Sequence, residues 1–247
     1  MIGTAGSGKS LLTASYSNWL KSERQDVITV NLDPAVVDLP YVPDVDVRDF
    51  VQMERIQKYG LGPNGALILA ADLIAEEAEN IGDEMESLKP DIAIIDTAGQ
   101  MELFAFRASG PYIVQELTKD PKAIIYLFDS VFSYDPLNYV SNLFLSAAVY
   151  TRFLKPQVHV LSKCDLLPEE EVENITEWSI EPESLEEAIN KRLTGTRRLL
   201  GHDLMQTIYR LGLNFSSISI SAKTNEGMTN LNSILERVFT SGEKYTS

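Results

Sequence analysis

A stretch near the start of the chain has the residue types and the spacing of a phosphate-binding loop. It reads Gly3-Thr4-Ala5-Gly6-Ser7-Gly8-Lys9-Ser10 and fits G-x-x-x-x-G-K-[ST] at every fixed position. The glycines allow consecutive backbone N–H groups to point at one anion, and the helix expected over Lys9–Leu20 adds its positive N-terminal end. We expect Lys9 to reach the β- and γ-phosphates, Ser10 to contact Mg²⁺, and Leu11 to complete the nucleotide-binding residues. The alternative is a flexible Gly/Ser loop.

Two acidic residues follow apolar segments that have the pattern of buried strands. Asp33 follows Val27–Leu32 and precedes Pro34, and Asp96 follows Ile92–Ile95. Ligands of doubly wound sheets bind at the carboxyl ends of the strands, so both carboxylates are expected at the ligand edge. We expect Asp96 on the metal side of the site and Asp33 near the attacking water or a Mg²⁺-bound water. A turn initiator before Pro34 is an equally good interpretation of Asp33.

The residues after Asp96 match the γ-phosphate sensor of P-loop hydrolases. They read Asp96-Thr97-Ala98-Gly99-Gln100. The backbone N–H of Gly99 is expected at the γ-phosphate, and Gln100 stands where Ras-like switches place the glutamine that orients the attacking water. An exposed residue at the start of a helix is the alternative interpretation of Gln100.

A loop after the expected strand Val158–Leu161 predicts guanine selection. It reads Ser162-Lys163-Cys164-Asp165. The carboxylate of Asp165 can accept both N1–H and the exocyclic amine of guanine, whereas adenine presents an acceptor lone pair to it. The stem of Lys163 can lie over the base, and an N–H from Ser221-Ala222-Lys223 can meet guanine O6. The competing interpretation is a routine polar turn after a strand.

The segment Gly62-Pro63-Asn64-Gly65 predicts a tight, stiff turn. Pro63 fixes φ, Asn64 tolerates the left-handed region, and Gly65 completes the turn. Asn64 is therefore expected on a rigid tip. The alternative is that Asn64 caps a helix expected over Ala66–Ile81.

These motifs require an α/β fold with a parallel sheet. About 60 residues with helical periodicity separate Leu32 from Ile92, and such a crossover implies parallel pairing in a right-handed βαβ unit. We predict a three-layer P-loop NTPase fold, with a mostly or wholly parallel sheet and helices on both faces. Residues 1–247 are expected to form a single domain, with helical insertions at about 44–82 and 169–211. The other expected elements are strands over Ala123–Asp129 and Phe215–Ile220, helices over Leu137–Phe153 and Met228–Phe239, an exposed acidic excursion over Glu169–Glu187, and a helical stretch over Leu185–Leu211 with a break near Gly201.

Only Met1 and Ile2 precede Gly3, although a central strand needs about five residues. We therefore expect either further apolar residues upstream of Met1 or a stunted first strand.

Composition excludes several classes of function. Cys164 is the only cysteine and His159 and His202 are the only histidines, so an internal disulfide is excluded and a zinc site is not expected. The net charge of −15 argues against a general nucleic-acid-binding surface. A run of about 18 apolar residues does not occur in the sequence, so we expect a soluble, cytoplasmic protein without membrane contact.

Taken in order, the phosphate loop, the Asp96 motif, the base loop and Ser221-Ala222-Lys223 resemble a P-loop GTPase. Gly62-Pro63-Asn64, between Asp44–Phe50 and the Asp96 strand, narrows the resemblance to the GPN-loop GTPases, a dimeric family of the parallel-sheet branch. The resemblance covers nearly the whole chain. It implies a homodimer in which Asn64 reaches toward the γ-phosphate on the opposite subunit and the subunits rearrange with nucleotide state. Switch or dimer contacts are accordingly assigned to Asp46, Arg48, Gly62, Pro63 and Asn64.

The chain departs from the family pattern at three positions. Ala98 stands where the family usually has Pro, and Ser162 stands where the base loop usually begins with Asn. The shorter Ser162 lacks the amide that braces the base loop, which places guanine selectivity in question. Thr4 stands where division-site ATPases of the same branch carry a signature lysine, so the chain lies outside that subgroup.

The leading functional hypothesis is a Mg²⁺-dependent GTPase that hydrolyses GTP to GDP and thereby switches a homodimer. Lys9, Asp33, Asn64 and Gln100 are its candidate catalytic residues. A P-loop kinase with a small-molecule or polynucleotide acceptor is the first alternative. The second is a nucleotide-regulated assembly adaptor with little turnover, since the resemblance includes eukaryotic members that act in RNA polymerase assembly. The sequence does not name the client protein.

Overall fold

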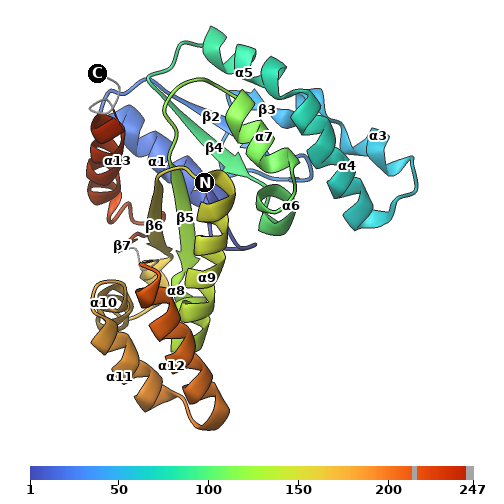
Figure 1. The fold of residues 1–247 in the computed structure, drawn as a ribbon. Coiled ribbons are helices and arrows are strands. Elements are labelled where there is room, and N and C mark those ends of the chain that lie inside the picture. Colours follow the sequence, from blue (N-terminus) through green and yellow to red (C-terminus); the bar gives the residue numbers. More distant parts are fainter. Residues whose placement is uncertain (213–215, 243–247) are drawn as a thin grey trace. The chain divides into compact units, whose positions relative to one another are not determined.

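The structure is a computed structural model that describes residues 1–212 and 216–242. The chain divides into two compact units, Met1–Lys122 and Ala123–Ser247 (Figure 1). In each unit, helices surround strands that pair in parallel. The predicted α/β class with parallel sheets is confirmed, whereas the single-domain assignment stays a prediction.

The sheet of the N-terminal unit is built around β2 (Val27–Leu32), all of whose residues are buried. β2 pairs in parallel with β4 (Ile92–Thr97) along its whole length and with β3 (Val45–Asp46) on its other side. Apolar and β-branched residues dominate β2 because both faces of a parallel strand are covered. The parallel pairing predicted across the long helical crossover is therefore confirmed.

The first strand, β1, comprises only Ile2–Gly3 and leads directly into the phosphate loop. The backbone of Met1 contacts β4, since its amino nitrogen donates to Ile95 O at 2.7 Å and its carbonyl accepts from Thr97 Oγ1 at 2.8 Å. These bonds place the start of the phosphate loop beside the carboxyl end of β4.

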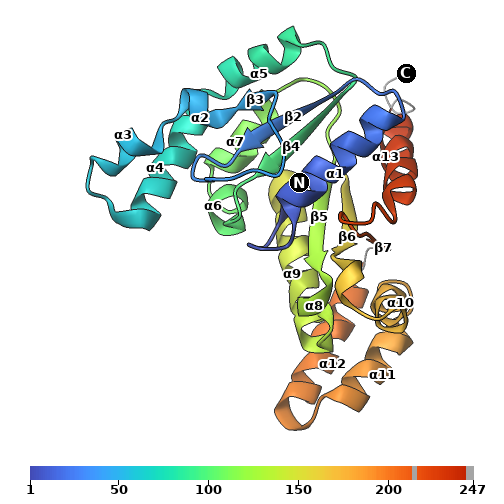
Figure 2. The same ribbon diagram turned by 180° about the vertical axis from the view of Figure 1, so that it is seen from behind.

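The helices of this unit cover both faces of the sheet. Their bounds are α1 (Lys9–Ser22), α2 (Val47–Phe50), α3 (Met53–Gln57), α4 (Gly62–Glu76), α5 (Ala78–Ser87), α6 (Met101–Ala105) and α7 (Ser109–Glu116). α1 crosses one face of β2 and β4, and α7 crosses the opposite face, as the views in Figure 1 and Figure 2 show. α4 packs beside α7.

Gly62-Pro63-Asn64 forms the first turn of α4 and not a separate turn before a helix. Gly62 has a φ of 70°, and Leu61 is the N-cap residue, with Pro63 in the first turn. Proline is favoured there because its missing N–H would have no partner within the helix. The predicted Pro-Asn turn and the alternative cap at Asn64 are therefore both wrong. The helix predicted over 66–81 is in fact two helices, α4 and α5.

The C-terminal unit has a parallel sheet in the order β5 (Ile124–Asp129), β6 (Gln157–Ser162) and β7 (Ser217–Ser219). Its core is aromatic: Tyr126 and Phe128 of β5 contact each other at 5.2 Å between ring centroids, and Phe128 lies 5.9 Å from Tyr139. The helical elements are α8 (Ser130–Ser133), α9 (Pro136–Phe153), the 3₁₀ turn η1 (Cys164–Leu166), α10 (Glu169–Trp178), α11 (Pro182–Arg192), α12 (Gly195–Arg210) and α13 (Met228–Gly242). Phe215, where the last strand was predicted to begin, lies outside the described residues.

Two predictions for the helical region of this unit are wrong. The stretch 169–187 is not simply an exposed acidic excursion, because Trp178 and Leu185 are buried and α10 and α11 pack into the unit. The helix break falls between α11 and α12, while Gly201 lies inside α12, where a Cβ would sit 3.4 Å from Leu193 Cδ1. Gly201 therefore lies within a continuous helix and does not end it. Among the described residues, every helix is too short or too polar to span a membrane.

Candidate nucleotide site

The phosphate loop has the backbone conformation that its glycines allow. Gly6 and Gly8 have φ values of 77° and 92°, a region in which other residues are strained. Gly8 is the N-cap of α1, and Ser7 N donates to Thr4 O at 3.1 Å, which closes the loop. The loop therefore ends at a helix N-terminus whose first N–H groups are available to an anion.

Lys9 is buried against the loop that precedes it. Its Nζ donates to Gly3 O at 2.9 Å and to Thr4 O at 3.0 Å. Burial lowers the pKa of Lys9, while the nearby carboxylates of Asp96 and Asp33 act in the opposite direction. An ammonium has three N–H donors, so one is left to contact a phosphate after these two bonds.

Asp96 is buried in β4 and lies next to Ser10. Burial raises the pKa of Asp96, and hydrogen bonds from the hydroxyls of Ser10 and Tyr41 oppose that shift. Tyr41 donates to Asp96 Oδ2 at 3.1 Å, whereas Oδ1 is buried and has no hydrogen-bond partner in the described part of the chain. Mg²⁺ is bound by oxygen ligands, commonly one or two from protein plus waters and substrate phosphates. The orphaned Oδ1 and the Ser10 hydroxyl fit such a metal.

Asp33 begins a turn, as one interpretation of its sequence position suggested, and its predicted contact with water stays a prediction. Its Oδ1 accepts from Ala35 N at 3.0 Å, which makes it the first residue of a turn. Its carboxylate is also close enough to Lys9 to act on that ammonium. The buried amide of Asn31 holds the Asp33 backbone, accepting from Asp33 N at 2.9 Å and donating to Asp33 O at 3.1 Å. The turn and the site therefore share one residue.

Asp46 and Arg48, assigned to switch or dimer contacts, form an ion pair with each other. Arg48 Nη2 lies 2.5 Å from Asp46 Oδ2, and Arg48 Nη1 donates to Val36 O at 3.3 Å. Asp46 Oδ1 also accepts from Asn31 Nδ2 at 2.9 Å. The pair thus ties the segment after Asp33 to β2 and β3.

Gly99 and Gln100 lie beside the phosphate loop. A Cβ at Gly99 would sit 3.8 Å from Ala5 Cβ, and Gln100 is the exposed N-cap residue of α6, with no side-chain cap bond. A cavity of about 190 Å³ borders both motifs. Its lining includes Ala5, Asp33, Gly99 and Gln100, together with apolar side chains of α4 and α6. Asp33 and Gln100 therefore face one space next to the loop.

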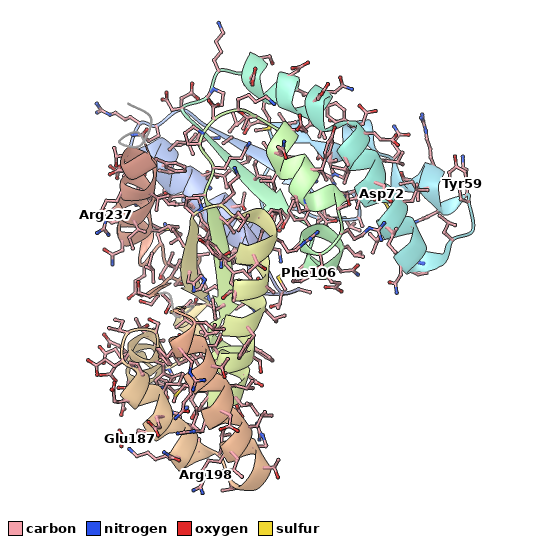
Figure 3. The ribbon with its side chains drawn as sticks, viewed as in Figure 1. Tyr59, Asp72, Phe106, Glu187, Arg198 and Arg237 are labelled. Carbon is pink, nitrogen blue, oxygen red and sulfur yellow. The ribbon has the colours of Figure 1, made fainter. Side chains whose placement is uncertain are left out.

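Asn64 does not join this group of residues. It is exposed in the first turn of α4 and is not among the described residues that line the cavity. Tyr59, on the connection that precedes α4, points away from the unit and is 71% exposed (Figure 3). The GPN tripeptide thus lies at an outward end of the N-terminal unit.

The base loop lies in the C-terminal unit and is internally bonded. Asp165 is exposed, and its Oδ1 accepts from Ser221 Oγ at 2.8 Å. Thr224 N in turn donates to Ser221 Oγ at 3.2 Å, which leaves the Ser221 hydroxyl proton to point at the carboxylate. Ser221 therefore orients Asp165, while the second carboxylate oxygen and the remaining lone pairs are available to a base. Ala222 and Lys223 follow at the same loop.

Comparison with known proteins identifies the family. Residues 1–241 match a family model described as "Conserved hypothetical ATP binding protein". The chain is 31% identical over 235 residues to the GPN-loop GTPase PAB0955 of Pyrococcus abyssi, covering 94% of this chain and 93% of that protein. The chain belongs to the GPN-loop GTPase family. Its fold also superimposes on the crystal structure of apo PAB0955, a GTPase, with a TM-score of 0.84 at 30% identity, covering 96% of this chain and 95% of the other.

Eukaryotic relatives of this GPN-loop GTPase are longer than the matched region. GPN-loop GTPase 1 of Dictyostelium discoideum is 29% identical over 223 residues, and GPN-loop GTPase 1 of Saccharomyces cerevisiae is 30% identical over 194 residues. These alignments cover 86% and 77% of this chain but only 56% and 50% of the relatives. The archaeal protein is therefore the better full-length match.

Sequence reasoning missed several residues of this GPN-loop GTPase that touch its motif residues. Tyr41 contacts Asp96, Asn31 holds Asp33, and Asp129 pairs with Lys163 at 2.7 Å. Only Asp129 left a signal in the sequence, since it is an acid at the end of a predicted strand. Tyr41 carries no such signal, because its partner Asp96 lies 55 positions away. Asn31 carries none either, because it stands inside a segment that has the pattern of a buried strand.

Proposed function

We propose that this GPN-loop GTPase is a cytoplasmic, Mg²⁺-dependent enzyme that hydrolyses GTP to GDP and uses the nucleotide state to rearrange a homodimer. The observation that carries the proposal is the gathering of Lys9, Ser10, Asp33 and Asp96 at the carboxyl ends of β2 and β4. P-loop hydrolases use these parts: a phosphate loop with its cation, a hydroxyl and an acid for the metal, and a group that positions water.

The residues divide the chemistry among them. The loop N–H groups and Lys9 bind the phosphates and stabilise negative charge on the transferring phosphoryl group. Ser10 and Asp96 would hold Mg²⁺, which when bound neutralises charge on the β- and γ-phosphates. Asp33 and Gln100 face the cavity beside the loop and are candidates to position the attacking water. We assign Asn64 to the nucleotide of the other subunit, because it is exposed and is not among the described residues that line the cavity.

The identity of the base is the point at which the family descriptions differ. The matching family model is described as ATP binding, whereas the relatives are named GTPases. Asp165 favours guanine because an ionised carboxylate only accepts hydrogen bonds and guanine presents two donors to it. We therefore propose that GTP is the substrate.

Equilibrium binding of GTP and ATP, with and without Mg²⁺, tests this proposal. The parent protein is expected to require Mg²⁺ for tight binding and to prefer GTP. Asp165→Asn is expected to narrow the GTP preference by about tenfold or more, because one acceptor becomes a donor opposite a donor. Equal affinity of the parent for ATP and GTP would refute the guanine assignment.

We further propose that the nucleotide-dependent dimer assists the assembly of a protein complex. Pull-downs with the protein loaded with GDP or with a non-hydrolysable GTP analogue test this role, and a client that binds both states equally would contradict it. A kinase activity remains the alternative outcome of the enzymology. Transfer of labelled γ-phosphate to a small-molecule or polynucleotide acceptor, in excess of transfer to water, would establish that alternative.

A further inference from the structure

Lys163, in the base loop of the C-terminal unit, is held both at its backbone carbonyl and at its side-chain ammonium group. The Lys163 backbone has a φ of 61° and a ψ of 34°, a left-handed conformation that is unfavourable for a residue with a Cβ. Its carbonyl accepts from Ser130 Oγ at 2.9 Å and from Leu166 N at 3.0 Å, and its Nζ donates to Asp129 Oδ2 at 2.7 Å. Contacts from the neighbouring strand and helix thus hold an unfavourable backbone conformation.

Asp129 is itself fixed by a second set of bonds. Its Oδ1 accepts from Val131 N at 2.9 Å and Phe132 N at 3.3 Å, which caps α8. The cap sets the rotamer of the carboxylate, so that Oδ2 is directed at Lys163. The side chains of Asp129 and Lys163 are only 19% and 32% exposed, which limits screening of the pair by solvent.

The position of Lys163 determines where Asp165 lies. Lys163 is the N-cap residue of η1, and Asp165 is the second residue of that turn. The next link is Cys164 N, which donates to Ile220 O at 3.2 Å. If Lys163 left the left-handed region, the turn would change its path and the Asp165 carboxylate would move away from the line of guanine N1–H and the 2-amino group.

We propose that Asp129 is a positioning residue that determines guanine specificity by holding Lys163 and, through it, the base-reading carboxylate of Asp165. The inference rests on the proposed function, in which Asp165 reads guanine. Asp129 itself need not touch the nucleotide.

Asp129→Asn is the test, because it separates the two roles of Asp129. Asparagine caps helices about as well as aspartate, so α8 keeps its cap while Lys163 loses its charged partner. Asp135→Asn is a matched control. Asp135 Oδ1 likewise caps a helix, accepting from Leu137 N at 2.9 Å, and its Oδ2 pairs with Arg197 at 2.9 Å. Within the described residues, these contacts of Asp135 do not involve the base loop. Ser130→Ala removes the second anchor, at a fully buried position that an alanine fills.

The measurements are dissociation constants for GTP, ITP and ATP, with thermal unfolding to confirm the fold. ITP lacks the 2-amino group, so the ITP/GTP ratio reports on the Asp165 carboxylate specifically. Asp129→Asn and Ser130→Ala are each expected to weaken guanine selectivity. The ratio of the dissociation constant for ITP to that for GTP, and the same ratio for ATP to GTP, should each fall by about 3- to 10-fold. Asp135→Asn is expected to keep the parental ratios of dissociation constants. Asp129→Glu keeps a negative charge beside Lys163, so it is expected to retain more selectivity than Asp129→Asn.

The outcomes distinguish this inference from the proposed function. A parent protein that prefers GTP, combined with parental ratios in a folded Asp129→Asn variant, would overturn the role of Asp129 alone. Equal loss of selectivity in Asp129→Asn and Asp135→Asn would mean that the loss follows from lower stability in general. That result would also overturn the role of Asp129. A parent without preference for GTP would refute the guanine assignment and, with it, this role.

Discussion

Asp46 connects three segments of the N-terminal unit through its carboxylate. Oδ1 accepts from Asn31 Nδ2 and from Arg48 N, and Oδ2 accepts from the Arg48 guanidinium. Burial acts to raise the pKa of Asp46, but the hydrogen bonds from Arg48 and Asn31 outweigh burial and hold the pKa below its ordinary value of 3.8. The same Asn31 amide also donates to the backbone of Asp33, so the Asp46 carboxylate helps to fix the position of Asp33 through Asn31.

Asp46→Asn is expected to lower the unfolding free energy by about 1–2 kcal/mol at neutral pH, since hydrogen bonds to a charged acceptor are lost. A carboxyl whose folded pKa is depressed contributes stability above its unfolded pKa, and that contribution disappears as pH falls through the folded pKa. The difference between parent and variant should therefore be constant from about pH 5 to 7 and shrink below pH 3.8. Urea unfolding across this range measures it.

Asp83→Asn, at an exposed position of α5, is the control and should leave stability unchanged at every pH. A difference between parent and Asp46→Asn that stays constant down to pH 3 would contradict the assignment.

The sequence alone identifies the residues of the phosphate and metal motifs, but it does not identify the residues that hold them in position. Lys9, Ser10 and Asp96 could be identified because phosphate and metal chemistry require fixed residue types at fixed spacing. Asn31 and Tyr41 could not, because their contacts with Asp46 and Asp96, 15 and 55 positions away, depend on how the intervening chain folds back. Chemistry at the ligand is visible in one sequence, whereas the groups that hold the ligand-binding residues are not.

At the scale of the elements, α6 and α7 approach each other closely at Gly110. A Cβ at this position would overlap Phe104 O, and only movement of the backbone can relieve that overlap. α6 begins directly after Gln100, so displacement of α6 also displaces the residue proposed to orient water. The phosphate loop precedes α1, away from this helix pair in the chain.

Gly110→Ala is therefore expected to destabilise the protein by about 1–3 kcal/mol and to lower kcat for GTP hydrolysis more than it lowers GTP affinity. Thermal unfolding and single-turnover hydrolysis at saturating GTP measure the two effects. Gly201→Ala in α12 is the control, because its nearest contact would be an ordinary 3.4 Å and alanine favours a helix. Parental turnover and parental stability in Gly110→Ala would show that the two helices do not constrain Gln100.

Some kinds of segment can be predicted from a single sequence and others cannot, as β2 and α4 show. The bounds of β2 were predicted correctly, because a continuous apolar and β-branched run between polar ends suits only a buried strand. The start of α4 was missed, because proline and glycine favour turns as well as the first turn of a helix. Local propensity does not distinguish a turn from the first turn of a helix in such a segment. Tertiary packing decides which of the two conformations forms.

At the scale of the whole molecule, both units of the chain carry motifs that we propose bind nucleotide. The phosphate and metal residues belong to Met1–Lys122, the base-reading residues to Ala123–Ser247. Asn64 is exposed and lies apart from the cavity lined by Asp33 and Gln100. An amide can hydrogen-bond both a water and a phosphate oxygen without a charge that must be desolvated. In a two-fold dimer each such contact occurs twice, so Asn64 can serve the site of the opposite subunit.

This arrangement predicts complementation between two inactive variants. Asn64→Ala is expected to lower kcat by about 10²–10³-fold, the effect of losing one preorganised donor, with GTP affinity nearly unchanged. Lys9→Ala is expected to abolish GTP binding. A heterodimer of the two retains one site in which Lys9 and Asn64 are both intact, so each heterodimer should have about half of the activity of a parental dimer.

Each variant alone is the baseline, and native mass spectrometry of subunits with different tags verifies that heterodimers form before hydrolysis is measured. Recovery should rise with the heterodimer fraction, because only that species contains a complete site. If verified heterodimers hydrolyse GTP no faster than the Asn64→Ala homodimer, Asn64 does not act across the interface. Its place in the first turn of α4 would then be structural, with water positioned by Asp33 and Gln100 within a single subunit.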